Sequence, residues 1–355
     1  MVATISDFIT RNNLFMATPM DTKVICTLLA KHFGENTFKT ESLILWHDRP
    51  KTSVYRFTIK KEVECHYYFK IYKNQKSAQT AEVEHHALTT MSNEFINSSN
   101  VGVINPIAYF PQHNAFITEE FIGEDLNSLL KKLTALWANK ADMAMALQAI
   151  DNLVDWFAIF QNSHFDELQP EYSLSALKEN TFVDIERAIE EQVVPSNLGV
   201  KSKAILTGFY QQNSAWDSAL VTSNGDAKLW NFLCSQNGDL RALDFVAIAH
   251  GLPAMDFARI WVGLNWLKNF PNVQNSKIEV LQNHLIKQAI QKEACDRAQF
   301  EYCRLCVMWE LTAFYSGIRK DKYRKKLRNI LFFPLIRKYF RKTIKTCIEE
   351  AEKYV

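Results

Sequence analysis

The chain has 355 residues and nearly balanced charges, with 41 lysines and arginines against 39 aspartates and glutamates, a net charge of +2. Hydrophobic residues make up 47% and charged residues 23% of the sequence, which excludes a disordered chain, a collagen and a small disulfide-bonded scaffold. The small net charge also argues against a general nucleic-acid binder, although a total can conceal an uneven distribution along the chain.

The cysteines and the apolar stretches favour a soluble, cytoplasmic protein. Seven scattered cysteines, an odd number, are typical of reduced thiols in a cytosol. Cys303 and Cys306 form a C-x-x-C pair inside an apolar stretch of helical periodicity, and without a second ligand pair we expect them in the core. The N-terminus lacks the pattern of a signal peptide, and the strongest apolar stretches, Phe257–Leu267 and Ile330–Ile336, are shorter than the ~20 residues of a membrane span.

The first third of the chain mixes strands with a helix. Its first forty residues have the pattern of short helices, and residues rich in β-branched and aromatic side chains follow. The predicted succession is a helix at Thr22–Phe33, paired strands at Ser53–Ile59 and Glu64–Ile71, a helix at Ser77–Met91, and strands at Ile104–Phe110 and Asn114–Ile122.

Helical periodicity dominates from Leu126 onward. The predicted helices are Asp125–Leu136, Ala141–Phe160, Tyr172–Glu191, Ser202–Gln212, Met255–Leu267, Ser276–Gln291, Arg297–Tyr315 and Lys322–Tyr354. One β-hairpin interrupts them, because Phe232–Cys234 and Leu240–Leu243 flank the tight-turn dipeptide Asn237-Gly238. The sequence therefore predicts a small β-rich part followed by a large helical part.

Three polar residues lie at the edges of this predicted hairpin. Asp226 and Asn231 precede its first strand, and Asp244 directly follows its second. A hairpin brings its two ends together, so Asn231 and Asp244 are expected to face one cation. Two oxygen ligands completed by substrate phosphates suit Mg²⁺, and a carboxylate beside them can accept a proton from an attacking hydroxyl group.

These residues carry a resemblance to a known family. Asp226-x4-Asn231 followed by Asp244 resembles the catalytic loop and metal-binding aspartate of the protein-kinase-like superfamily. The continuation Asp244-Phe245-x5-Gly251-x-Pro253-x2-Asp256 resembles the aminoglycoside phosphotransferase and choline kinase-like families, which phosphorylate small-molecule hydroxyl groups. The short interval between Asp244 and Asp256 leaves little room for the peptide-binding segment of a protein kinase.

The resemblance extends upstream in the same order. Lys70 in a predicted strand resembles the lysine that holds nucleotide phosphates, and the spacing of Glu84 and Leu88 favours Glu84 over Glu82 as its partner. The stretch that contains Glu119, Glu120, Phe121 and Ile122 resembles the linker whose backbone binds adenine.

Several positions depart from the family pattern. The turn before Tyr55 has no glycine, which leaves Ser53 as the candidate phosphate donor. Asn224 occupies a position that is usually histidine. Lys228 follows Asp226 by two residues, and a cation there could steady the transferred phosphoryl group. Asp256 is expected both to cap the next helix and to brace the catalytic loop.

The resemblance implies an α+β, bilobal protein-kinase-like fold. Its nucleotide-binding N-lobe would span residues 1–122, with a helical extension at 1–42, and its helical C-lobe residues 123–355. The implied activity is transfer of the γ-phosphoryl group of ATP to a hydroxyl group, with Asp226 and Lys228 as catalytic residues, Asn231 and Asp244 holding Mg²⁺, and Lys70 and Glu84 at the nucleotide.

The identity of the acceptor is suggested by charge alone. Residues 166–191 contain eight acids and two bases, which suits a cationic acceptor such as an aminoglycoside or an amino alcohol, or simply a solvated helix face. Residues 319–345 contain twelve bases and one acid around an aromatic stretch, which is typical of attachment to an anionic membrane surface and would suit a lipid-linked or envelope glycan. A solvated terminal helix is the alternative, and a nucleic-acid role is disfavoured.

Two other classes of protein stay open at this point. A pseudokinase that binds nucleotide and acts as a scaffold would explain the glycine-free turn and Asn224. A protein kinase acting on peptides is disfavoured by the short segment after Asp244.

Overall fold

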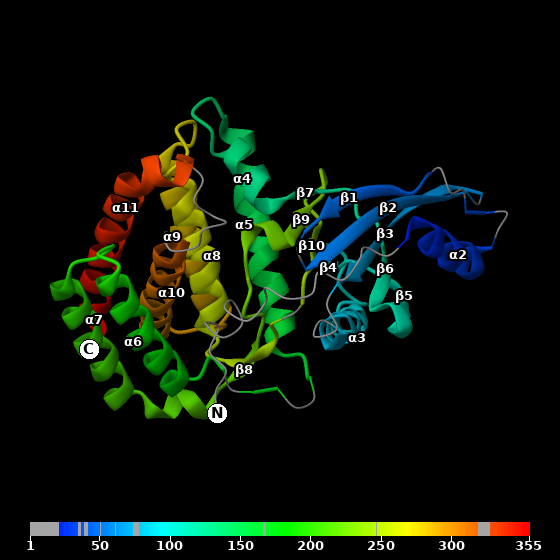
Figure 1. Cartoon of the computed structure of the whole chain (residues 1–355). Coiled ribbons are helices and arrows are strands. Elements are labelled where there is room, and N and C mark those ends of the chain that lie inside the picture. Colours follow the sequence, from blue (N-terminus) through cyan, green and yellow to red (C-terminus); the bar gives the residue numbers. More distant parts are fainter. Residues whose placement is uncertain are drawn as a thin grey trace. The chain divides into compact units, whose positions relative to one another are not determined.

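The computed structural model describes residues 21–34, 37–38, 42–49, 51–60, 62–73, 78–165, 168–169, 171–245, 247–318 and 327–355, and for residues 78–80, 317–318 and 327–333 it describes the backbone alone. The chain divides into two compact units (Figure 1). Unit 1 comprises Met1–Asn97, Gly102–Ile122 and Arg241–Val246, and unit 2 comprises Ser98–Val101, Gly123–Leu240 and Ala247–Val355.

Unit 1 is built on a five-stranded antiparallel sheet in the order β1-β2-β3-β6-β5. Its strands are β1 (Ile44–Asp48), β2 (Thr52–Lys60), β3 (Glu64–Tyr72), β5 (Pro106–Phe110) and β6 (Ala115–Glu119), and the short helix η3 (Pro111–His113) joins the last two. Two helices, α2 (Thr22–Phe33) and α3 (Ala78–Glu94), complete the described elements of this unit. The predicted helix at Thr22–Phe33 and the predicted strand pair are confirmed.

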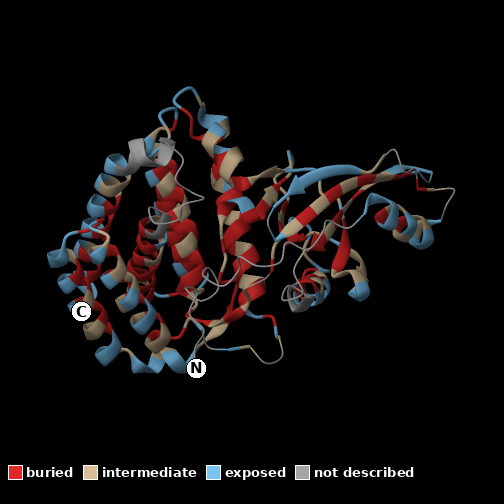
Figure 2. Ribbon diagram, in the orientation of Figure 1, coloured by how far each residue is buried: buried red, intermediate tan, exposed pale blue. Residues whose placement is uncertain are grey.

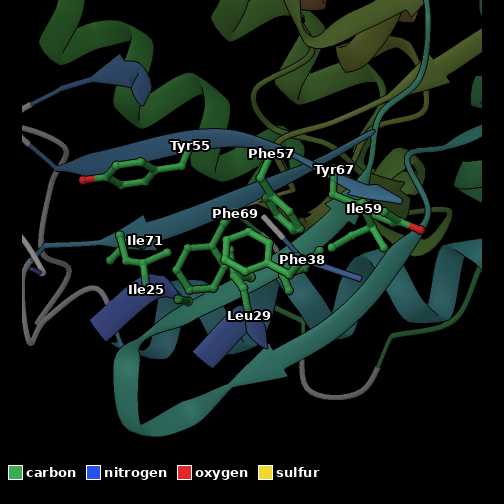
Figure 3. Packing of buried hydrophobic residues seen from close by; sticks show 11 residues of the cluster. Ile25, Leu29, Phe38, Tyr55, Phe57, Ile59, Tyr67, Phe69 and Ile71 are labelled. Atoms are coloured by element: carbon green, nitrogen blue, oxygen red, sulfur yellow. The ribbon is translucent and has the colours of Figure 1, made fainter. Parts of the chain in front are cut away.

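The core of unit 1 lies between α2 and one face of the sheet. Along β2, buried and half-buried residues alternate, as the two-residue period of a strand requires. Ile25 and Leu29 of α2 pack with Phe57 of β2 and Phe69 of β3, and none of the four side chains is exposed (Figure 3). Lys70, next to Phe69, therefore points to the opposite face of the sheet.

Strand β1 is an element that the sequence did not predict. All five of its residues are exposed, including Ile44, Leu45 and Trp46. It is the outer strand of the sheet and pairs with β2 alone. Since neither of its faces is buried, its sequence carries no alternation between apolar and polar residues that would indicate a strand.

Unit 2 is mainly helical. Its helices are α4 (Leu126–Leu133), α5 (Lys140–Gln161), α6 (Leu174–Glu190), α7 (Ser196–Gln212), α8 (Ala254–Leu267), α9 (Asn275–Gln291), α10 (Arg297–Ile318) and α11 (Leu327–Ala351), with short helices η4 (Ser214–Ser218), η5 (Leu229–Asn231) and η6 (Glu352–Tyr354). The helices α5, α8 and α10 are buried along most of their length, whereas α6 and α7 expose an outer face (Figure 2).

The helix boundaries agree with the sequence prediction to within a few residues in most cases. Local capping explains this agreement, because Asn139 caps α5 in a capping box with Asp142, and Ser173 caps α6. Helix α7 begins at Ser196, six residues before the predicted start at Ser202. The predicted start of the last helix, at residue 322, lies outside the described residues.

Aromatic side chains form the core of unit 2. Trp156 stacks on Phe160 with ring centroids 4.8 Å apart, and Phe157 meets both Phe232 and Phe257 edge to face at 5.7 and 5.2 Å. These contacts join α5 to the segment after η5 and to α8, so the core directly supports the loop that carries Asp226 and Asn231.

Helix α5 is long and apolar enough, by length and composition alone, to cross a membrane. Half of its apolar window is buried inside the fold, and it carries much of the aromatic core, so it packs as a core helix. The cysteines at 303 and 306 are likewise buried in α10, and all seven cysteines are free thiols, as predicted.

Short strands frame the loops of unit 2. They are β4 (Val101–Val103), β7 (Glu124–Asp125), β8 (Val221–Ser223), β9 (Phe232–Cys234), β10 (Leu240–Ala242) and β11 (Ala249–Gly251), and the chain passes between the two units within β4 and within β10. The predicted hairpin is confirmed, because β9 and β10 are neighbours and the N–H of Ser235 donates to the carbonyl of Asp239 at 2.9 Å. A β-rich unit beside a mainly helical unit confirms the predicted α+β class.

Candidate functional site

In unit 1, the predicted nucleotide-binding lysine is held by two carboxylates. The ammonium of Lys70 on β3 lies 2.9 and 2.8 Å from the two carboxylate oxygens of Glu84 on α3, and 3.0 Å from Oδ1 of Asp244. The hydroxyl group of Tyr72, which points to the same side of β3, also donates to Glu84. The preference for Glu84 over Glu82 as the lysine partner is thereby confirmed.

Glu84 is the buried member of this cluster, whereas the side chains of Lys70 and Asp244 are partly exposed. Glu84 is 1% exposed, and burial disfavours the charged form of both partners. For Lys70 the carboxylates of Glu84 and Asp244 outweigh the effect of burial and raise the pKa of the ammonium well above its ordinary value. For Glu84 burial is the largest influence and raises the pKa, against the opposing effect of Lys70. The network therefore keeps a positive charge at the end of β3.

Asp244 adopts a backbone conformation that is unusual for a residue with a side chain. Its φ angle is 71°, in the left-handed region. Aspartate tolerates this region better than most residues, but the conformation still costs of order 1 kcal/mol and persists where the surroundings fix it. The contact with Lys70 is one such constraint, and it aims the carboxylate of Asp244 at the lysine.

Ser53, the candidate phosphate donor, is engaged elsewhere. It is 3% exposed, and its hydroxyl group donates to Asp48 at 2.7 Å. Lys73 also contacts the carboxylate of Asp48 and, with the hydroxyl of Ser53, lowers its pKa. A contact between Ser53 and a phosphate group would first require this hydrogen bond to break.

The candidate adenine-binding segment begins at the end of β6. The N–H groups of Glu119 and Glu120 donate to the carbonyls of Asn105 and His66 at 2.9 Å each. The carboxylate of Glu120 is taken by Arg56, with N–O distances of 3.0 and 2.8 Å. Since the sheet uses these groups, adenine recognition would fall to the backbone of the following residues.

Those following residues, Phe121 and Ile122, are available for such a role. Ile122 is 83% exposed, and the ring of Phe121 lies 5.4 Å from the guanidinium carbon of Arg241. The structure thus separates the four candidates of this segment into two that complete the sheet and two that follow it.

In unit 2, the predicted catalytic residues cluster around Asp226. Lys228 forms an ion pair with the carboxylate of Asp226. The side-chain amide of Asn231 donates to the backbone carbonyl of Asp226 at 3.0 Å and to its Oδ2 at 3.3 Å. Because the amide nitrogen makes these bonds, the amide oxygen of Asn231 is the atom that could bind a cation.

Gly225 allows the chain to turn into this loop. Its φ angle is 48°, and a Cβ atom at this position would lie 2.3 Å from the carbonyl oxygen of Ala247 and 2.4 Å from the hydroxyl group of Tyr172. No other residue has both the conformational freedom and the absence of a side chain that this position needs. The turn delivers Asp226 at the end of β8.

Asp256 holds the catalytic loop through hydrogen bonds, as expected, but it is not a helix cap. Its Oδ1 accepts from the hydroxyl group of Ser223 at 3.1 Å, and its Oδ2 accepts from the N–H of Asn224 at 3.0 Å. The prediction of an N-cap is wrong, because α8 begins at Ala254 and Asp256 lies within its first turn. Burial raises the pKa of Asp256 to about 6, against its hydrogen bonds and Arg259.

Asn224 lacks the polar contacts that its side chain could make. It is completely buried, and among the described residues neither its amide nitrogen nor its amide oxygen has a hydrogen-bond partner. Nδ1 of His250, on the paired strand β11, is buried without a partner among the same residues. An unpaired buried amide costs of order 1–3 kcal/mol, so this position is a weak point of the loop.

The sequence did not indicate a set of polar side chains that pack next to the catalytic loop. The guanidinium of Arg259 lies 5.4 Å from the ring of Tyr172, and its Nη1 lies 3.0 Å from an oxygen of Glu310. Burial raises the pKa of Tyr172 to about 12. Burial together with Glu310 raises the pKa of Asp184 on α6 to about 7. These residues come from three segments that are distant in the sequence, so no local motif could have identified them.

Other candidates have structural roles. His85 stacks on Tyr109, with ring centroids 5.3 Å apart, as expected for a packing residue. In the part of the chain that the structure describes, no group of three or more His, Cys, Asp and Glu side chains is arranged to hold a metal ion. A cation would therefore depend on oxygen atoms of the kind that Asn231 and Asp244 offer, together with those of a bound substrate.

Comparison with known proteins shows the fold. No family model matches the chain, and no curated protein matches it. Solved structures match along nearly its whole length, and all of those described here are less than 25% identical to it. A macrolide 2'-phosphotransferase from Brachybacterium faecium is 13% identical, with a TM-score of 0.56, and the match covers 93% of this chain and 98% of that one.

Two further solved structures give the same result. An amicoumacin kinase in complex with AMP-PNP, Ca²⁺ and Ami is 14% identical, with a TM-score of 0.57 and coverage of 91% and 94%. A choline kinase from Cryptosporidium parvum is 13% identical, with a TM-score of 0.56 and coverage of 94% and 96%. The chain has the fold that these phosphotransferases and kinases share, which confirms the bilobal kinase-like fold expected from the motifs.

Proposed function

We propose that the protein is an ATP-dependent phosphotransferase that moves the γ-phosphoryl group to a hydroxyl group of a small molecule or sugar. The observation that supports this most strongly is the contact of Lys70 with Glu84 and Asp244. A lysine held in this way is what the fold uses to bind nucleotide phosphates. The amicoumacin kinase of this fold was solved with an ATP analogue, which supports the choice of nucleotide.

Asp226 is the proposed general base. Its carboxylate would accept the proton of the acceptor hydroxyl group while the hydroxyl oxygen forms a bond to the γ-phosphorus. The bond between that phosphorus and the bridging oxygen of the β-phosphate breaks, and ADP leaves. Lys228, which contacts Asp226, would balance negative charge on the transferred group.

Asn231 and Asp244 are the proposed ligands of a divalent cation, on the sequence motif that they share with kinases. Their hard oxygen donors fit Mg²⁺, which binds through few protein ligands plus phosphates and water. When bound, the cation would neutralise phosphate charge. Lys70 and Glu84, with the backbone of Phe121 and Ile122, would position the nucleotide. Ser53 would join them only after its hydrogen bond to Asp48 breaks.

The acceptor is proposed to be a small molecule that carries positive charge. The solved proteins of this fold are named for macrolide, amicoumacin and choline substrates, so their acceptors differ widely. Asp184 and Glu310 in unit 2 place two carboxylates near each other, and their mutual repulsion contributes to the raised pKa of Asp184. A cationic acceptor would relieve that repulsion.

A finer proposal concerns a lipid-linked or envelope glycan as acceptor and peripheral contact with an anionic membrane through residues 319–345, at the inner face of a cytoplasmic membrane. The charge of this segment supports it, and much of the segment lies outside the described residues. A nucleotide-binding pseudokinase is the second candidate, since Asn224 is buried without hydrogen bonds among the described residues and Ser53 already bonds Asp48.

The decisive experiment replaces the proposed base. We expect Asp226→Ala to lower transfer of labelled γ-phosphate, to water or to a panel of aminoglycosides, choline and sugars, by about 10²–10⁴-fold, the usual contribution of a general base. Nucleotide affinity, measured with a fluorescent ATP analogue, should stay within about two-fold, because Asp226 contacts Lys228 and Asn231 but not Lys70.

The matched control is Asp155→Ala, which removes an exposed carboxylate of α5 that pairs with Lys292 on the surface. It should leave both measurements unchanged, since exposed ion pairs contribute little. Turnover that Asp226→Ala leaves intact would refute the assignment. Nucleotide binding without any Mg²⁺-dependent turnover in the wild type would favour the pseudokinase.

A further inference from the structure

A basic groove lies between α7 and α11 of unit 2, and all but one of its lining residues belong to the basic segment 319–345 discussed above. Its volume is about 610 Å³. Leu198 lines it from α7, and six residues line it from α11: Pro334, Arg337, Lys338, Arg341, Lys342 and Lys345. The two helices run side by side in Figure 1, and Lys201 of α7 pairs with Glu352, just beyond α11, at 2.7 Å.

The five cations of the groove form one stripe on α11, because they recur at intervals of one and three residues, which is the period of a helix face. The opposite face of α11 is fixed in the core by Phe340, Ile344, Cys347 and Ile348, none of which is more than 1% exposed. Arg341 is held further, because its Nε donates to the carbonyl of Val193 at 3.1 Å. The stripe therefore cannot rotate away from the groove without disrupting the core.

The three lysines of the stripe have little or no neutralisation from acidic residues. Lys345 pairs with Glu349 at 3.8 Å, and both side chains are more than half exposed. Among the described residues, Lys338 and Lys342 have no acid within ion-pair distance. Nearby acids are used elsewhere, since Glu186 pairs with Lys203 and Glu350 with Lys353. Like charges at i and i+4 destabilise a helix, and bound negative charge would offset that destabilisation.

The start of α7 adds to the positive field. This helix of 17 residues begins without a side-chain cap after Pro195, and its first turn, which includes Leu198, has no acidic residue. The N-terminus of a helix carries partial positive charge, which attracts anions. The first turn of α7 and the stripe therefore line the same groove.

We propose that this groove binds a phosphate-bearing anion. An exposed apolar residue next to the lining residue Pro334 favours a lipid headgroup as the source of that phosphate. Leu335 is 61% exposed next to Pro334, and an exposed apolar side chain beside clustered lysines is typical of contact with an anionic membrane surface. The inference does not depend on the phosphotransferase activity, because the groove shares no residue with the proposed catalytic machinery.

The test compares two charge-reversed variants of the full chain. The first is Lys338→Glu with Lys342→Glu in the stripe. The second is Lys287→Glu on α9 with Lys292→Glu directly after that helix, which changes the net charge equally at exposed positions outside the groove. Circular dichroism and thermal unfolding check that both variants fold, and Lys338→Gln with Lys342→Gln provides a milder stripe variant.

Binding is measured by co-sedimentation with vesicles of phosphatidylcholine, with and without phosphatidylglycerol, and by calorimetry with tripolyphosphate. We expect the wild type to bind the phosphatidylglycerol vesicles, and the stripe variant to bind at least about ten-fold more weakly, because each lysine at such a surface contributes about 1 kcal/mol. The control variant should bind within about two-fold of the wild type, and so should Asp226→Ala, which separates this result from any failure of the catalytic assignment.

A wild type that binds tripolyphosphate but no vesicle, with the stripe variant binding neither, would support the groove and assign a soluble phosphate compound as its ligand. Absence of binding in both measurements would overturn the proposal. An equal loss in the stripe and control variants would overturn it as well, since the effect would then follow net charge rather than the groove.

Discussion

Asp256 is a carboxyl group with no exposed surface, and two hydrogen bonds from the catalytic loop reach it. Burial raises its pKa to about 6, from an ordinary value of 3.8, although both hydrogen bonds favour the charged form. The free energy needed to ionise this buried carboxyl group is therefore part of the free energy needed to hold the loop in its folded conformation. A single side chain links the pH dependence of stability to the position of Asp226.

The first prediction follows from the sign of this shift. A carboxyl group whose pKa is higher in the folded state stabilises the fold below about pH 4, and that contribution is lost as the pH rises through 6. A shift of about two units corresponds to about 3 kcal/mol in the free energy of unfolding. Asp256→Asn, which cannot ionise, should lack this loss.

Urea unfolding of the wild type and the variant at several values between pH 4 and pH 7 measures the difference. The gap between the two unfolding free energies should change by about 3 kcal/mol across that range. Asp155→Asn, which removes an exposed carboxylate, serves as the control. Its free energy of unfolding should change with pH in parallel with that of the wild type. Parallel curves for Asp256→Asn would contradict the prediction.

The loop between β8 and η5 is the element that presents Asp226. Its geometry depends on Gly225, which combines a φ angle of 48° with close packing against Ala247 and Tyr172. The β8–β11 pair and Asp256 hold its base, with Ser223 opposite Ala249 in the ladder. The loop is therefore fixed from two sides, and its shape leaves no space for a methyl group.

The second prediction is that Gly225→Ala disables transfer by displacing Asp226. The added Cβ would meet a backbone oxygen at 2.3 Å, so the main chain must move. We expect a loss of phosphotransfer of at least about 10²-fold, because small displacements of a catalytic group have effects of that size. Initial rates and thermal unfolding midpoints measure the loss and the accompanying destabilisation.

Gly238→Ala is the matched control for this change. Gly238 also has a positive φ angle, of 92°, but a Cβ there would come no closer than 4.0 Å to a neighbouring atom. It should lose stability from backbone strain alone and keep its activity. Equal losses of activity in the two variants would show that strain, and not the clash at the loop, is responsible.

At the scale of the whole molecule, the near-neutral charge conceals separate regions of opposite sign. Residues 166–191 carry a net charge of −6 and residues 319–345 a net charge of +11, so the first segment offsets about half of the second in the total. Each unit has its own core, of aromatic and β-branched residues around α2 in unit 1 and of stacked aromatics around α5 in unit 2. The proposed nucleotide-binding residues belong to unit 1, and the proposed catalytic residues Asp226 and Lys228 belong to unit 2.

The third prediction concerns the stability of the full chain with bound nucleotide. A non-hydrolysable ATP analogue with Mg²⁺, at about 100 times its dissociation constant, should add about 2.7 kcal/mol to the free energy of unfolding. Leaving out Mg²⁺ should reduce that gain. In Asp244→Asn, which weakens the proposed cation ligand, the gain should no longer depend on Mg²⁺.

Thermal unfolding with and without analogue and cation measures these effects, and Asp155→Asn is again the control that should match the wild type. Stabilisation that is independent of Mg²⁺ in the wild type would argue against the cation site. Stabilisation that keeps its Mg²⁺ dependence in Asp244→Asn would remove Asp244 from it.

The sequence predicted the elements whose signal is local. The helix at Thr22–Phe33 has its apolar stripe and its cap within twelve residues, and β2 and β3 alternate strongly. The pair of Lys70 with Glu84 could be predicted because a family motif records it. Strand β1 could not be predicted, because it is exposed on both faces. Tyr172 and Arg259 could not either, because their contact joins segments that are distant in the chain.

The return of the chain to unit 1 at Arg241–Val246 has a consequence for how the protein is made. Asp244, which contacts Lys70, leaves the ribosome only after all the helices and strands from α4 to β10 have been synthesised. Domains generally fold as units during synthesis, from the N-terminus onward. Here the charged centre of the first unit stays without one of its carboxylates until most of the second has emerged, so a fragment ending at Ile122 would lack that partner permanently.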